Sequence, residues 1–83
     1  MKAEGVLAGV SDLCLPCPSR NYHGLYIEMK SEDGTLTEAQ SAFLNRRIKY
    51  GYCAAVCHSA KDGIAALEWY CGLTEYQPKC IIF

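Results

Sequence analysis

Two acidic residues and one lysine in the N-terminal half of the chain have the types and the spacing for phosphate chemistry. Glu28 and Lys30 are two residues apart at the end of the apolar stretch Gly24–Lys30. Side chains of a β-strand alternate between its two faces, so these two charges share a face, with their Cα atoms about 7 Å apart. A second acid, Asp12, directly precedes another apolar run, Leu13–Leu15. Two acids and a lysine in this arrangement can hold a divalent cation against a phosphate group.

The reaction indicated is hydrolysis of a phosphodiester bond. Carboxylates of Asp12 and Glu28 about 4–5 Å apart would repel each other by about 3–4 kcal/mol at an effective dielectric constant of about 20, and a divalent cation between them reverses the sign. Hard oxygen ligands favour Mg²⁺ or Mn²⁺. Such a cation lowers the pKa of a bound water, and Lys30 can orient the water or neutralise the phosphate. The alternative is a solvated strand face on which Lys30 simply pairs with Glu28.

A small sheet must bring these residues together. The segments Asp12–Pro16 and Tyr22–Lys30 have strand composition, and the Pro, Ser and Asn residues between them favour a turn. We therefore expect a hairpin-like pair that places Asp12 beside Glu28. Three apolar residues alternate with the charged ones and are expected to enter the core: Leu25, Ile27 and Met29.

The clearest helix is predicted for Thr37–Tyr50. Thr37 is a good N-cap, and Gln40 three residues later completes a capping box. Gly51 follows the last helical residue, where a C-terminal glycine is common.

A buried strand is then expected at Tyr52–Cys57, and a second helix begins at Ser59 and continues to Tyr70. The last strand follows a helical crossover, so it can pair in parallel with an earlier one. The predicted fold is α/β, a small mixed sheet flanked by helices, in a single domain over residues 1–83. Residues 1–8 are expected to be an extended lead-in or the end of a helix, and the apolar end Ile81–Phe83 to pack on the core or on a second subunit.

The motifs, taken in order, resemble the VRR-Nuc family of the PD-(D/E)xK nuclease superfamily. A lone Glu-x-Lys is a weak signal, whereas the ordered set is fairly specific. Ser11 stands where the family usually has proline before the first acid. The resemblance extends from about Lys2 to about Leu67 and includes these stretches: Lys2–Gly5, Ala8–Leu13, Gly24–Lys30, Leu36–Gln40 and Gly51–Tyr52.

This resemblance implies a restriction-endonuclease-like core and a metal-dependent DNA endonuclease of phage, prophage or related origin. It implies action on branched or structured DNA, and a homodimer in the shortest members. The family usually has an N-terminal helix with another glutamate, for which this sequence has no room, so we expect the short N-terminus to affect activity. The implied catalytic residues are Asp12, Glu28, Lys30 and Gln40, and the implied metal ligands are Asp12, Glu28 and the carbonyl of Met29.

Two of these assignments have structural alternatives. Gln40 can serve the site or cap the helix at Thr37, and the limited reach of one amide disfavours both roles together. The basic cluster of Arg46, Arg47 and Lys49 can be a solvated helix face or can contact DNA phosphates.

Bulk composition restricts the possible partners. The net charge of -1 gives no strong basic field, although phosphate contacts normally supply most of the affinity of a DNA enzyme. An 83-residue chain has a marginal core, yet 51% of its residues are hydrophobic, so we expect a homodimer. No apolar run is long enough to cross a membrane, and no signal peptide is recognisable, which indicates a cytoplasmic protein.

The six cysteines suggest a function of another class. Cys14 and Cys17 form a CxxC, a spacing found in redox motifs, and could join Cys53, Cys57 and His58 in a zinc site. The alternative function is accordingly a small non-enzymatic zinc-binding or protein-interaction domain. The strand context of these residues favours reduced thiols instead. Three of them are expected to replace small apolar residues: Cys53, Cys57 and Cys71.

Overall fold

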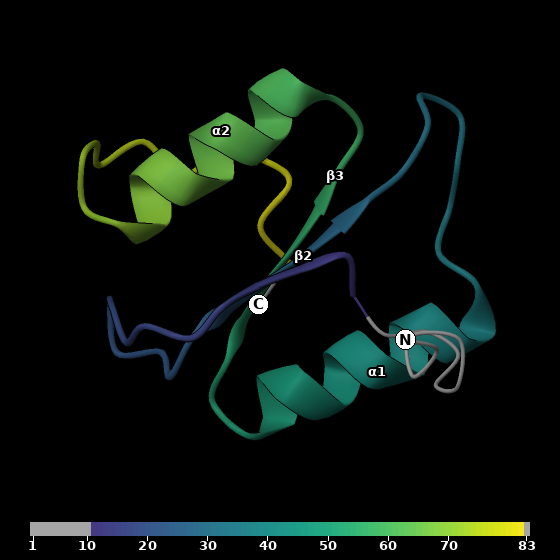
Figure 1. Cartoon of the computed structure of the whole chain (residues 1–83), viewed down its shortest axis with the longest axis horizontal. Coiled ribbons are helices and arrows are strands. Elements are labelled where there is room, and N and C mark those ends of the chain that lie inside the picture. The colour runs from purple at the N-terminus through teal and green to yellow at the C-terminus, as the bar shows by residue number, and fades with distance from the viewer. Residues whose placement is uncertain (1–10, 83) are drawn as a thin grey trace, which may run out of the picture.

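The computed structural model describes residues 11–82, which form a three-stranded mixed sheet with one helix on each face (Figure 1). The expected α/β architecture is confirmed. The predicted lead-in at residues 1–8 and the terminal Phe83 lie outside the described residues. Neither helix within residues 11–82 has the length and apolar character needed to cross a membrane. In chain order, the elements are β1 (Leu13–Leu15), β2 (Leu25–Met29), α1 (Glu38–Lys49), β3 (Cys53–Cys57) and α2 (Ala60–Tyr70).

The central strand β2 pairs with both other strands. β1 runs antiparallel to it with Leu13 opposite Ile27, as the hairpin-like pattern predicted. Continuing this register by one residue places Asp12 opposite Glu28. A Cβ atom on Gly24 would lie 2.9 Å from the carbonyl oxygen of Leu15, so the two strands can approach this closely only because residue 24 is glycine.

The crossover from β2 to β3 is built around α1, and both ends of this helix have the caps that the sequence predicted. Thr37 and Gln40 form the reciprocal capping box. At the other end, Gly51 adopts a φ of 93°, and its N–H donates to the carbonyl of Ile48. The chain leaves the helix at this glycine, and β3 pairs in parallel with β2, with register Ile27 to Ala55.

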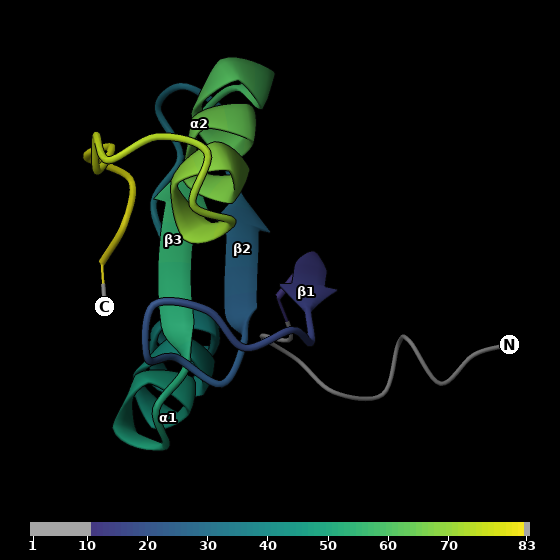
Figure 2. The same ribbon diagram turned by 90° about the vertical axis from the view of Figure 1, so that its left-hand side faces the viewer.

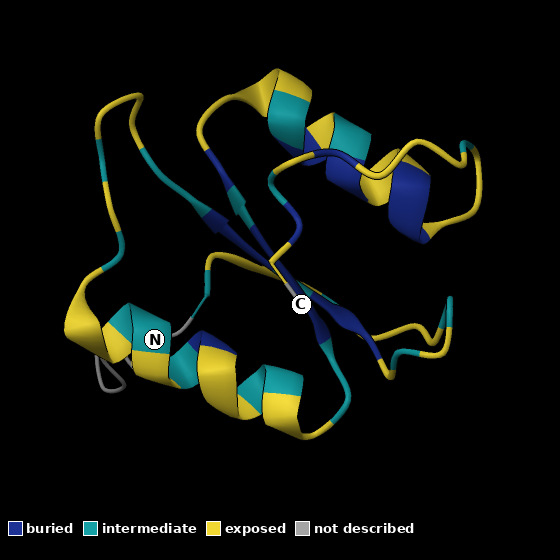
Figure 3. Cartoon of the chain, turned by 180° about the vertical axis from the view of Figure 1, so that it is seen from behind, coloured by how far each residue is buried: buried dark blue, intermediate teal, exposed yellow. Residues whose placement is uncertain are grey.

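The face of the sheet under α2 holds the larger apolar cluster. Figure 3 shows the buried segments along β2, β3 and the inner side of α2. Cys53 and Cys57 are buried in this cluster, as expected, whereas Cys71 is exposed and that prediction was wrong. The buried members are Leu25, Ile27, Cys53, Ala55, Cys57, Ala66, Trp69, Tyr70 and Ile81.

The C-terminal segment lies along the outer edge of β3 (Figure 2). Ile81 pairs with Ala55 in an isolated antiparallel bridge, and the N–H of Ile82 donates to the carbonyl of Ala54. Ile81 is only 6% exposed, which confirms that this part of the apolar end packs on the core. The edge of β3 is therefore partly covered, whereas β1 forms the other edge of the sheet.

Candidate active site

Glu28 is the only charged residue counted among the buried residues of the described chain, and it lies near the end of β2. Its exposed fraction is 2%. Sequence reasoning placed it on the face away from the apolar residues of β2, and strand alternation confirms this. The same reasoning did not foresee that α1 would cover that face and exclude water from the carboxylate. A solvated strand face is therefore wrong for Glu28.

Gln40 holds one oxygen of this carboxylate in place. Its Nε2 donates to Oε2 of Glu28 at 3.0 Å, while its Oε1 accepts the backbone N–H of Thr37 at 2.9 Å. The expectation that one amide could hardly serve both roles was wrong, because its oxygen and nitrogen point to different partners. The capping box thus fixes the orientation of the amide that contacts Glu28.

Asp12 lies at the start of β1, across the sheet from Glu28. Its Oδ2 accepts the backbone N–H of Met29 at 2.9 Å. This hydrogen bond joins β1 to the end of β2 and leaves the second oxygen of the exposed Asp12 carboxylate available. Lys30 continues from Met29, and its backbone N–H donates to the carbonyl of Cys57 on β3, 2.8 Å away.

The two carboxylates and the lysine act on one another electrostatically. Burial raises the pKa of the Glu28 carboxyl above its ordinary value, and the neighbouring Asp12 carboxylate raises it further. The Lys30 ammonium and the backbone N–H of Asp12, which lies near the Glu28 carboxyl, lower this pKa and so act in the opposite direction. The structure therefore brings Asp12, Glu28, Lys30 and Gln40 to one end of β2.

The oxygen atoms at this position suit a hard divalent cation. Oε1 of Glu28 is buried and has no hydrogen-bond partner among residues 11–82, and an unpaired buried oxygen of this kind is costly unless a ligand satisfies it. Carboxylate oxygens of Asp12 and Glu28 match the preference of Mg²⁺, which is typically bound through one or two carboxylates and keeps several waters. Within residues 11–82, no group of three or more His, Cys, Asp or Glu residues is placed to hold a metal ion.

The three basic residues of α1 differ in environment. Arg46 and Lys49 are exposed, as expected of a solvated helix face. Arg47 is half-buried, and its guanidinium carbon lies 4.8 Å from the centroid of the Phe43 ring. No signal in the sequence distinguishes Arg47 from its neighbours.

The cysteines of the rival zinc arrangement lie in contrasting environments. Cys14 and Cys17 are exposed, whereas Cys53 and Cys57 are buried. Burial raises the pKa of the Cys53 thiol to about 11 and that of the Cys57 thiol to about 12. Within residues 11–82, these cysteines and His58 form no group of three or more residues placed to hold a metal ion.

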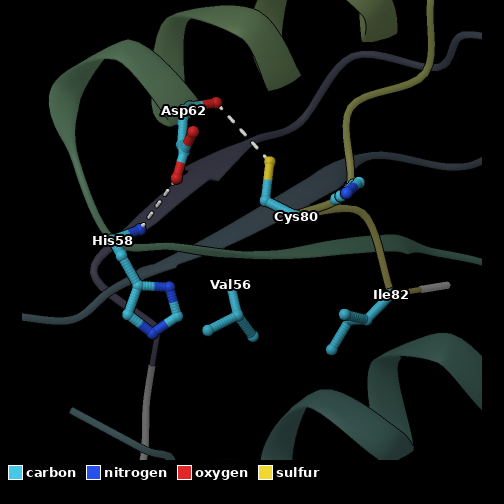
Figure 4. Close-up of a pocket in the computed structure, with 6 residues that line it drawn as sticks. Val56, His58, Asp62, Cys80 and Ile82 are labelled. Carbon is cyan, nitrogen blue, oxygen red and sulfur yellow. Dashed lines mark hydrogen bonds between the residues drawn. The ribbon is translucent and has the colours of Figure 1, made fainter. Parts of the chain in front are cut away.

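His58 belongs to a separate hollow of about 430 Å³ at the edge of β3 (Figure 4). Several of its groups take part in hydrogen bonds or close polar contacts. The backbone N–H of His58 approaches Oδ2 of Asp62 at 3.4 Å, and the Cys80 thiol donates to the carbonyl oxygen of Asp62 at 3.5 Å. The His58 ring lies 3.0 Å from the carbonyl oxygen of Gly34. His58 therefore ties the loop after Lys30 to the end of β3.

Comparison with known proteins bears on the whole arrangement. Residues 1–61 match the VRR-NUC domain family. The match covers β1, β2, α1 and β3, and it ends at the second residue of α2, somewhat before the Leu67 limit of the resemblance seen in the sequence. No curated protein and no solved structure is significantly similar to the chain.

Proposed function

Because the chain belongs to the VRR-NUC domain family, whose members are nucleases of the PD-(D/E)xK type, we propose that it is a divalent-metal-dependent DNA endonuclease. One observation carries the proposal. The buried Glu28 carboxylate is held by Gln40, lies across the sheet from Asp12, and has one oxygen without a partner. A domain selected for stability alone would gain nothing from this oxygen, whereas a cation site uses it.

Asp12 and Glu28 would hold the cation, with the carbonyl of Met29 as a further oxygen ligand. The Asp12 hydrogen bond to the Met29 N–H fixes these ligands relative to one another. A bound Mg²⁺ or Mn²⁺ supplies charge stabilisation on the phosphate and a more acidic water. Partial exclusion of water around Glu28 strengthens such electrostatic interactions.

The remaining residues position the Glu28 carboxylate and neutralise the charge of the phosphates. Lys30 follows directly on the strand and places a positive charge beside the attacked phosphate, where it can also orient the water. Gln40 keeps the Glu28 carboxylate in one orientation, so the ligand does not have to reorganise when charge develops. Arg46, Arg47 and Lys49 on α1 supply contacts to the DNA backbone.

The DNA is proposed to be branched or structured, and the enzyme to be a homodimer. A C₂ dimer presents two sites and two basic helices to one substrate, which suits a junction with two-fold character. Light scattering at micromolar concentration tests the dimer, because a monomer would have only the 9.2 kDa mass of one chain. A duplex and a four-way junction of shared sequence test the preference.

The function itself is tested by cleavage and by metal binding, measured together. Wild-type protein should cut DNA in Mg²⁺ or Mn²⁺ and not in EDTA. Asp12→Asn and Glu28→Gln should weaken calorimetric binding of Mn²⁺ and reduce cleavage in parallel, because each removes one charged ligand. The proposal is wrong if the wild type binds Mn²⁺ but cuts neither the duplex nor the four-way junction. It is also wrong if Glu28→Gln cuts DNA as fast as wild type.

A further inference from the structure

Arg47 is an unusual cation for a helix surface. It is half-buried, and its Nε atom is inaccessible to water and has no hydrogen-bond partner in the described part of the chain, residues 11–82. No carboxylate pairs with it, because the one ion pair within residues 11–82 joins Arg20 to Glu75. A guanidinium that loses water without gaining an anion is costly, so its surroundings favour an anionic ligand from outside the chain.

The packing around Arg47 fixes where its guanidinium lies. It stacks over Phe43, and the Phe43 ring meets the Tyr26 ring edge-on at 5.5 Å between centroids. The Arg47 side chain also contacts the Tyr26 hydroxyl. Tyr26 is two residues before Glu28 on β2, so strand alternation places both on the face under α1. Arg47 therefore belongs to the same layer of the molecule as the candidate site.

Helix geometry gives its separation from that site. Arg47 follows Gln40 by seven residues, which is close to two full turns and about 10 Å along the helix axis. Both side chains therefore emerge on nearly the same side of α1. This separation is large enough for Arg47 to contact a phosphate other than the one attacked at the site.

A hollow of about 260 Å³ lies along α1 beside Arg47 and leaves room for part of a DNA backbone. The lining is Ala39, Ala42, Phe43, Arg46 and Arg47. The small alanine side chains keep the hollow open, and the planar guanidinium at its end has the fork geometry that suits a phosphate.

We infer that Arg47 forms a phosphate-binding subsite for the cleaved DNA strand, at a phosphate other than the one attacked. This inference rests on the proposed endonuclease function and makes the three basic residues of α1 unequal. Arg47 is held by Phe43 and Tyr26 before DNA arrives, so it binds one defined phosphate. Arg46 and Lys49 are exposed and act through a field that salt screens within about 10 Å.

The experiment measures binding without cleavage. A fluorescently labelled four-way junction is titrated in EDTA at several salt concentrations with wild type, Arg47→Gln, Arg47→Lys and Lys61→Gln. Lys61 is exposed on α2, so Lys61→Gln removes the same charge from a site outside the proposed subsite. Arg47→Gln should weaken binding about tenfold or more and lower the slope of log K against log salt by about one. Arg47→Lys should keep the slope but bind less tightly, because it loses the stacked fork.

Thermal melting separates this role from a structural one. No carboxylate within residues 11–82 pairs with Arg47, so Arg47→Gln should lose only the packing on Phe43 and Tyr26 and melt close to the wild-type temperature. Equal affinity and slope for Arg47→Gln and Lys61→Gln, with wild-type binding intact, would overturn the inference and leave the endonuclease proposal standing. A lower melting temperature with an unchanged slope for Arg47→Lys and Arg47→Gln would assign Arg47 to packing instead. A wild type that neither binds nor cuts DNA would overturn both.

Discussion

Ile27 and Glu28 are neighbours on β2 and have the same exposed fraction, 2%, yet they belong to opposite faces of the sheet. Ile27 enters the apolar cluster under α2, where burial of a hydrocarbon side chain stabilises the fold by about 1.5–3 kcal/mol. Glu28 lies under α1, where the same loss of water disfavours its charge and raises its pKa. One face of the sheet stabilises the molecule, and the other gives up stability to hold a carboxylate.

The two faces also differ in the surroundings that they give to an ionisable group. Under α2, burial and the neighbouring Cys80 and Asp62 together raise the pKa of the Cys57 thiol to about 12. Under α1, Glu28 receives a hydrogen bond from Gln40 and the opposing effect of Lys30. Both faces therefore disfavour a buried charge, but on the α1 face Glu28 has a hydrogen-bond donor in Gln40 and a positive charge nearby in Lys30. The predictions that follow test this division.

The largest effect is expected from Lys30→Ala. Both carboxylates remain, so calorimetric titration should show that Mn²⁺ still binds. Cleavage should fall by about 10²-fold or more, the scale typical of removing one preorganised group that stabilises a transition state. A time course with Ile27→Val as the matched control on the same strand gives the comparison. Cleavage by Lys30→Ala at the wild-type rate would show that this residue has no part in the reaction.

Gln40 allows its two roles to be separated. Gln40→Ala loses the reciprocal cap and the donor to Glu28, and should destabilise the protein by about 1 kcal/mol in EDTA. Gln40→Glu keeps an acceptor for the Thr37 N–H but sets a second carboxylate against Glu28. The melting temperature of Gln40→Glu in EDTA should be lower than that of wild type, and the addition of Mg²⁺ should restore it. If Mg²⁺ shifts the melting of Gln40→Ala and Gln40→Glu equally, the contact with Glu28 is not part of a metal site.

The α2 face should respond to a change of volume alone. Ile27→Val removes one buried methylene group and should cost about 0.5–1.5 kcal/mol in urea unfolding. The α1 face should be unaffected, so cleavage per folded molecule should equal that of wild type. A substantial loss of cleavage at full folding would show that the two faces are coupled through β2.

The smallest effect concerns pH and the metal-free protein. The raised pKa of Glu28 means that the folded state keeps its proton when the unfolded state has already lost it. Stability should therefore fall as pH rises from the ordinary glutamate pKa, about 4.3, through the higher value of the folded state. Glu28→Gln should lack this contribution. Its melting temperature in EDTA should therefore rise relative to that of wild type as pH approaches neutrality. A constant difference between the two proteins across this range would contradict the assignment.

Local sequence was enough to predict the elements and their order. The cap at Thr37, the glycine at Gly51 and the alternation along β2 depend on near neighbours in the chain, and each is found as predicted. Hairpin pairing placed Asp12 across from Glu28 for the same reason. The error at Cys71 arose because a small residue near the end of α2 can face either the cluster or water, and its position alone does not decide between them.

Tertiary packing decided the burial of these residues and their hydrogen-bond partners. The sequence shows the spacing of Glu28 and Lys30 directly. The burial of Glu28 depends on how α1 packs on the sheet, which is a tertiary contact. The double role of Gln40 and the stacked, unpaired state of Arg47 have the same origin. Sequence determined which groups could do chemistry, whereas the solvation and partners that set their charge came only from the assembled layers, because desolvation depends on neighbours from every element at once.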